Sequence, residues 1–221
     1  MVYLLTLFAA RPMTTFMLLL VCCAGANGAT GSLEAPAAGD ELTDVAAATT
    51  DAGAMAAAKV EAFHQALIEA LRLHEHKQRE ALLRPLIIEL FDVQRIAAIS
   101  LGRTWRELAQ EQQGVFIELL ATLIVATYAD RFAGYSGQRF VTEGVEAVKS
   151  GFVVRTRLLR PDEEAVSLNY LMRNERVFNV VADGVSDLSL RRADYNSVIK
   201  NQGYDALLDH IRDKIALARG G

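Results

Sequence analysis

Apolar residues in the first half of the chain recur with the spacing of helices. Val60, Phe63, Leu67 and Leu71 lie three or four residues apart, and a second apolar series follows at residues 82–90. This period places the apolar side chains of each segment on one face. The pattern therefore predicts amphipathic helices that pack on a common core.

A central segment, residues 111–135, is apolar on nearly every side. Between residues 115 and 129 its only charged residue is Glu118. A helix of this kind has no polar face to turn toward water, so it cannot lie at a protein surface. We expect it to be the central helix of the domain.

Beyond Gly137 the pattern changes from helical to alternating, which is typical of strands. The predicted strands are residues 139–142, 152–159, 165–172 and 177–182. Short polar turns separate the last three, and the alternation indicates a sheet with one covered face. A last helical part is expected at residues 195–199 and 204–217. The chain thus predicts an α+β fold, with N-terminal helices packed on a curved antiparallel sheet of about four strands, and C-terminal helices.

The first 28 residues have the outline of a secretory signal peptide. A short apolar stretch at residues 13–21 is followed by small residues, and Arg11 is the only charge before Ala26. The stretch is shorter than the roughly 20 residues that a membrane-spanning helix needs. We expect cleavage after Ala26 or Gly28, and an uncleaved N-terminal anchor is the alternative.

Residues 29–55 are rich in Ala, Gly, Thr and acidic residues, with little apolar bulk. Such a composition predicts a flexible tether. The folded domain is then expected at residues 56–218. With 221 residues and 52% hydrophobic residues, the chain has enough apolar material for one core.

The net charge and the cysteine content argue against several classes of function. The formal net charge is −4, so no excess of Lys and Arg is present to neutralise phosphates, and a nucleic-acid partner is disfavoured. The two cysteines, Cys22 and Cys23, lie inside the predicted signal peptide. The mature chain would therefore have no thiol for catalysis, disulfide formation or metal binding.

The sequence has no recognisable motif for catalysis or for cofactor binding. The chain has no G-x-S-x-G, G-x-x-x-x-G-K-[ST], H-E-x-x-H or G-x-G-x-x-G motif. His74 and His76 are two residues apart, so on a helix they would point to different sides. His64 and His210 are interpreted as helix-surface residues. We predict no enzyme, no catalytic residue, no metal and no cofactor.

Several segments, taken in their order and spacing, resemble the MlaC family of periplasmic phospholipid-shuttling proteins, also called toluene-tolerance proteins. They include Leu-Gly-Arg-Thr-Trp at residues 101–105, Tyr-Ser-Gly-Gln at 135–138 and Asn-Val-Val-Ala-Asp-Gly-Val-Ser at 179–186. The chain departs from the family at residues 176–178, where a tryptophan is usual. Its residues 189–195 look more like the branch linked to hopanoid production.

The resemblance implies a periplasmic lipid carrier with a role in outer-membrane lipid asymmetry. Such a carrier shields a phospholipid or another membrane lipid in an apolar cavity. Its implied partners are an inner-membrane transporter complex and an outer-membrane acceptor complex. Two alternatives stay open: a hopanoid-binding transport protein of the same family, and an exported interaction domain whose apolar groove binds a peptide.

Candidate lipid-binding residues are the apolar side chains expected to face the interior from the central helix and the covered sheet face, together with one tryptophan beside them. They are Trp105, Ile124, Tyr128, Phe132, Val154, Leu168, Tyr170 and Val180. For each, plain core packing is the alternative. Arg191 and Arg192 are the candidate partner-docking residues, because they form a local basic pair in an acidic protein; a solvated pair without a function is the alternative.

Overall fold

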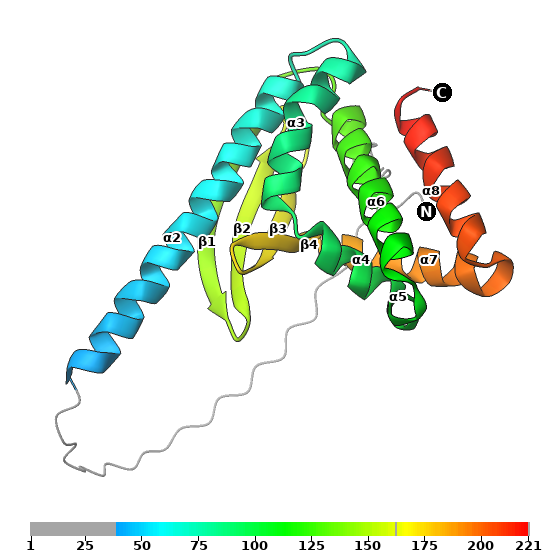
Figure 1. Ribbon diagram of the computed structural model, residues 1–221. Coiled ribbons are helices and arrows are strands. Elements are labelled where there is room, and N and C mark those ends of the chain that lie inside the picture. The colour runs from blue at the N-terminus through cyan, green and yellow to red at the C-terminus, as the bar shows by residue number, and fades with distance from the viewer. Residues whose placement is uncertain (1–38, 162, 221) are drawn as a thin grey trace, which may run out of the picture. The chain divides into compact units, whose positions relative to one another are not determined.

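The computed structural model describes residues 39–161 and 163–220 of the chain (Figure 1). The chain divides into two units, residues 1–48 and 49–221, and all side-chain contacts given below lie within the second. The predicted signal peptide and residues 29–38 of the predicted tether lie outside the described residues.

The described residues form seven helices and a sheet of five strands, which confirms the α+β class. The helices are α2 (Gly39–Ala70), α3 (His76–Leu90), α4 (Val93–Leu101), α5 (Arg103–Glu107), α6 (Gln110–Arg131), α7 (Asp187–Gln202) and α8 (Tyr204–Ala218). The strands are β1 (Arg139–Val148), β2 (Gly151–Leu159), β3 (Val166–Arg173), β4 (Arg176–Ala182) and β5 (Val185–Ser186).

The sheet is an antiparallel meander in which each strand pairs with the next along the chain. Tyr170 of β3 lies opposite Val154 of β2 and Val180 of β4, so the three share one face. Leu168 is two residues from Tyr170 and lies on the same face. Val154, Leu168 and Tyr170 are buried, as expected for the covered face of the sheet.

The opposite face of β1 and β2 is charged. Arg155 pairs with Glu146, and Arg157 pairs with Glu143 at 2.7 Å. These side chains are about half-exposed, and such pairs stabilise a fold only slightly. The sheet therefore has one face for the core and one for solvent.

Helix α6 is the central helix that the sequence predicts. It packs between α3 and α8 (Figure 1) and buries Phe116, Leu120 and Val125 completely. Among the described helices it alone is long and apolar enough to cross a membrane, but the core helix of a globular domain has the same properties. Its burial between two helices accounts for its composition.

Helix α2 begins earlier than expected. The composition of residues 39–55 predicts a tether, but in the structure they belong to the helix that ends at Ala70. Alanine has the highest helix propensity of all residues, and this stretch contains many alanines. A lack of apolar bulk therefore does not prevent the segment from being helical, and α2 begins before the predicted domain boundary at residue 56.

Other boundaries also differ from the predictions; strand β1 continues to Val148, past the predicted end at residue 142. Helix α6 ends at Arg131, and Phe132 leaves the helical conformation ahead of Gly134, whose φ is 85°. Helix α7 begins at Asp187, earlier than residue 195, because the hydroxyl of Ser186 caps it by accepting a hydrogen bond from the amide of Ser189 at 3.1 Å.

Gly151 provides a test of the sheet geometry. It opens β2 with φ of 146°, and a Cβ at this position would collide with the backbone carbonyl oxygen of Met172 in β3. We expect Gly151→Ala to lower the free energy of unfolding by about 2 kcal/mol, measured by urea titration. Gly144→Ala in β1 is the matched control, because a Cβ at that position meets nothing within 4 Å. Equal stabilities of the two variants would contradict this geometry.

Candidate lipid-binding site

Six aromatic side chains and one histidine form a continuous cluster between the helices and the covered face of the sheet. Neighbouring rings in it have centroids 3.9–6.1 Å apart. The members of this aromatic cluster are Phe63, His64, Phe91, Tyr128, Phe132, Phe140 and Tyr170. They come from α2, the α3–α4 junction, the end of α6, β1 and β3, so the cluster joins the helical part of the domain to the sheet.

His64 is the polar centre of this cluster. Its ring is stacked on Phe140 at 3.9 Å, and its Nε2 lies 3.0 Å from the hydroxyl oxygen of Tyr170, within hydrogen-bond distance. Only 4% of the residue is exposed, and burial lowers the pKa of His64 from 6.5 to about 3. The interpretation of His64 as a helix-surface residue is therefore wrong, and the imidazole is neutral at pH 7.

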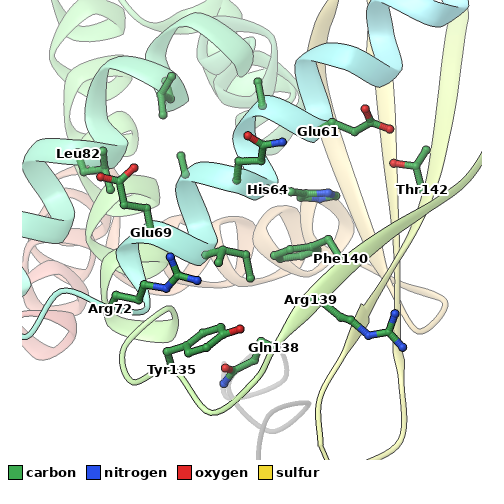
Figure 2. A pocket seen from close by; sticks show the side chains of 15 residues that line it. Glu61, His64, Glu69, Arg72, Leu82, Tyr135, Gln138, Arg139, Phe140 and Thr142 are labelled. Carbon is green, nitrogen blue, oxygen red and sulfur yellow. The ribbon is translucent and has the colours of Figure 1, made fainter.

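A cleft of about 1020 Å³ opens beside the aromatic cluster, as Figure 2 shows. Its walls come from α2, from α3 and from residues 135–142, which lead into β1. The apolar part of its lining consists of Ala62, Ala66, Ile68, Leu82, Leu86 and Phe140. Phe140 and His64 belong both to the cleft and to the cluster, so the cluster supports one wall of the cleft.

The rest of the lining is polar and charged. Helix α2 contributes Glu61, Gln65 and Glu69, spaced four residues apart, followed by Arg72. Residues with this spacing form one line along a helix. The cleft therefore combines an apolar wall with a charged rim, which is the arrangement that an amphiphilic ligand requires.

The other side of the rim is a turn at residues 134–138 that its own side chains hold in place. The side-chain oxygen of Gln138 accepts a hydrogen bond from the amide of Ser136 at 2.7 Å, and its Nε2 donates to the carbonyl oxygen of Gly134 at 3.3 Å. This turn presents Tyr135, whose ring centroid lies 4.9 Å from the guanidinium carbon of Arg72. The cation–π contact connects the turn to the end of α2.

The predicted lipid-binding residues are absent from the lining of the cleft. Tyr128, Phe132 and Tyr170 belong to the aromatic cluster, and Ile124 is one helical turn before Tyr128. Val154, Leu168 and Val180 are on the covered sheet face, as described above. Contact with lipid stays a prediction for these seven residues.

Trp105, the eighth candidate, lies apart from this group. It is on the short helix α5 and is half-buried, and its carbonyl oxygen accepts a hydrogen bond from the side chain of Gln113 at 2.8 Å. No ring contact joins it to the aromatic cluster within the described part of the chain. Its expected position beside the lipid stays a prediction.

No pattern in the sequence identifies the residues that line the cleft. Arg72 and Tyr135 come from segments 63 residues apart, and no periodic pattern connects two such positions. The line of Glu61, Gln65 and Glu69 on α2 could have been recognised as a polar stripe beside the apolar one. The stripe alone would still have been indistinguishable from an ordinary solvated face.

The two candidate docking arginines have different surroundings. Arg191 is largely buried, with its guanidinium bound to the carboxylate of Asp187 at 2.9 Å and to the hydroxyl of Tyr195 at 3.2 Å. This ion pair and hydrogen bond occupy Arg191 inside the domain, so it does not form a solvent-facing pair with its neighbour. Arg192 is exposed, and for it a docking role stays a prediction.

Metal binding has no structural support in the described ranges. Within residues 39–161 and 163–220, no three His, Cys, Asp or Glu side chains come together in a way that could hold a metal ion. The one buried imidazole described above, that of His64, is hydrogen-bonded to a tyrosine.

The arrangement of this domain recurs in a solved structure of a lipid-binding protein. That structure is of a phospholipid-binding protein from Ralstonia solanacearum in complex with a phospholipid, and the match has a TM-score of 0.64. The match covers 74% of this chain and 98% of the other, at 22% sequence identity. At this identity the likeness establishes a shared fold.

The sequence itself identifies the family. The profile of the family described as MlaC protein matches residues 61–213, which is more than half of the chain, and the chain therefore belongs to the MlaC family. This confirms the resemblance drawn from the motifs. A comparison with curated proteins gave no match.

The neutral, buried state of His64 predicts a pH dependence of stability. The native pKa of about 3 lies below the unfolded value of 6.5, so between these pH values the unfolded chain binds more protons than the native one. The free energy of unfolding should therefore fall as the pH is lowered through this window, by at most about 1.4 kcal/mol per pH unit from this residue.

Urea titrations of the parent protein and of His64→Gln between pH 7 and pH 4.5 measure this effect. The variant should lose the part of the slope that His64 contributes, whatever its stability at pH 7. His74→Gln is the control, because His74 is exposed. If the slope of His64→Gln equals that of the parent, His64 is not the group responsible.

Proposed function

We propose that this protein is a lipid carrier that binds a phospholipid in the cleft between α2, α3 and β1. The single observation that carries the proposal is the amphiphilic lining of the cleft, with an apolar wall beside the aromatic cluster and a charged rim. Membership of the MlaC family and the shared fold with a phospholipid-bound protein support it. Binding and transport need no catalytic group.

The chemistry of lipids explains why such a carrier is needed. Moving one acyl chain of about 16 carbons from a membrane into water costs roughly 0.8 kcal/mol per methylene, or about 13 kcal/mol in total. The apolar wall of the cleft, with Ile68, Leu82 and Phe140, offers the chain a replacement for the membrane interior. The charged rim can stay in contact with water and with the polar headgroup.

We further propose that the carrier works in the periplasm, after export by a cleaved signal peptide. In this proposal it receives its lipid from one membrane complex and delivers it to another, one in the inner membrane and one in the outer. The apolar stretch at residues 13–21 and the family membership support this compartment. The partner complexes follow from the family resemblance of the sequence.

The lipid cargo can be identified directly. The mature protein is purified from cells without detergent and extracted with organic solvent, and the extract is analysed by mass spectrometry. We expect about one phospholipid per protein. A polycyclic lipid in the extract would favour the hopanoid alternative, and a repeated absence of any lipid would favour a groove that binds a peptide.

The position of the cleft is tested by Ile68→Asp. Ile68 is half-buried in the apolar wall, and a carboxylate there would lie against the acyl chain. The cost of such contact exceeds the roughly 1.4 kcal/mol that corresponds to a tenfold change, so lipid occupancy should fall at least about tenfold. Ile88→Asp on α3 is the matched control, since Ile88 is 45% exposed and lies outside the cleft lining. Equal occupancies in the two variants would exclude this cleft.

Export is tested by the N-terminus of the mature protein. N-terminal sequencing of protein from the membrane-free periplasmic fraction should give a chain that begins at Asn27 or Ala29, because these residues follow the two predicted cleavage positions. An intact Met1 on protein that sediments with membranes would contradict the proposal and favour the uncleaved anchor.

A further inference from the structure

We propose that the rim of the cleft recognises a zwitterionic phosphoethanolamine headgroup, with Arg72 holding its phosphate and Glu69 its ammonium group. This inference rests on the proposed lipid-carrier function and adds a lipid class to it. Its basis is the balance of positive and negative charges around the opening of the cleft. Figure 2 shows both side chains extending from α2 at the cleft, Arg72 toward the turn that carries Tyr135 and Glu69 toward Leu82 of α3.

Glu69 and Arg72 have the spacing that a zwitterion needs. They are three residues apart on α2, and on a helix such residues are neighbours with Cβ atoms about 5–6 Å apart. The phosphate and the ammonium of phosphoethanolamine are joined by only two carbons, so the two charges of the headgroup are also close neighbours. One headgroup can therefore contact both side chains.

Both side chains are available to a ligand. Within the described residues neither forms an ion pair within 4 Å, with the other or with a third residue. Arg72 is instead placed over the ring of Tyr135, and both Glu69 and Arg72 are exposed. The cation–π contact orients the guanidinium at the rim and leaves its N–H groups free to donate to phosphate oxygens.

The whole rim is balanced in charge. Glu61 and Glu69 carry two negative charges, and Arg72 and Arg139 carry two positive charges. His64 adds none at pH 7, because its imidazole is neutral. An anionic headgroup would gain from the arginines but would be repelled by the carboxylates. A headgroup with both signs gains from each.

Glu69 also distinguishes between the common zwitterionic headgroups. A primary ammonium has three N–H donors and can hydrogen-bond to a carboxylate. The quaternary ammonium of choline has no N–H group and is bulkier. We therefore expect ethanolamine to be preferred to choline as well as to anionic glycerol headgroups.

The test uses the mature protein, freed of lipid, and vesicles with equal amounts of ethanolamine, glycerol and choline phospholipids with identical acyl chains. The lipid loaded onto the protein is then extracted and quantified by mass spectrometry. At low salt we expect ethanolamine lipid to be enriched about threefold over each of the others, which is within the range of exposed ion pairs. The enrichment should shrink at about 0.5 M salt, where screening is stronger.

Two variants of Glu69 test whether this carboxylate recognises the ammonium group. Glu69→Gln should bring the ratio of ethanolamine to glycerol lipid to about one, and Glu69→Lys should reverse it. Arg72→Gln should reduce loading of all three lipids about two- to fivefold, because they share the phosphate. Glu118→Gln on α6 and Arg106→Gln on α5 are matched controls, because both residues are exposed and lie outside the cleft lining.

The outcomes separate this inference from the proposed function. If the parent protein loads no lipid, the carrier function itself fails. If it loads the three lipids equally, or if Glu69→Lys keeps the preference for ethanolamine, the headgroup assignment is overturned while the carrier function stands. Because Glu69 is exposed, its substitution should leave the fold intact, and the melting temperatures of the variants verify this.

Discussion

The hydrogen bond between His64 and Tyr170 is the contact on which the rest of the site depends. Leaving a buried polar group without a partner costs about 1–3 kcal/mol, so the rotation of α2 that brings His64 to Tyr170 is favoured over rotations that separate them. This rotation places Phe63 among the rings of α3 and α6. It also turns the line of Glu61, Gln65 and Glu69 toward the cleft. One internal contact thus determines where the rim of the cleft lies.

The opposite wall of the cleft depends on a second buried polar residue. The guanidinium of Arg79, at the start of α3, donates hydrogen bonds to the carbonyl oxygens of Leu73 and His74 at 2.9 and 2.8 Å, and to that of Ala129 at 2.6 Å. The first two carbonyls lie in the loop between α2 and α3, and that of Ala129 lies in the last turn of α6, where a helix leaves acceptors without partners. Arg79 therefore ties α3, with its cleft residues Leu82 and Leu86, to the loop that follows α2 and to the end of α6.

The sequence predicted those parts of the structure whose residues follow a period. The apolar helix at 110–131 and the meander of β2 to β4 were found because burial imposes a regular pattern on neighbouring positions. The role of His64 could not be found, because its partner Tyr170 is 106 residues away and a single histidine has no pattern. The surroundings of Arg191 could not be found for a related reason. Adjacent arginines look like a surface patch, but Asp187, one helical turn earlier, draws the first of them into the domain.

The combination of a filled cluster and an open cleft agrees with reversible exchange of a lipid. The aromatic cluster is already packed with side chains, so it keeps the domain folded when no lipid is bound. In the proposed function, an acyl chain that moves from a membrane to the apolar wall of the cleft exchanges one apolar environment for another, and most of the roughly 13 kcal/mol cost of exposure to water is avoided at both ends. The free-energy difference between the two bound states is then small. A carrier of this kind speeds lipid exchange without setting its direction, which must come from the membranes or complexes that it meets.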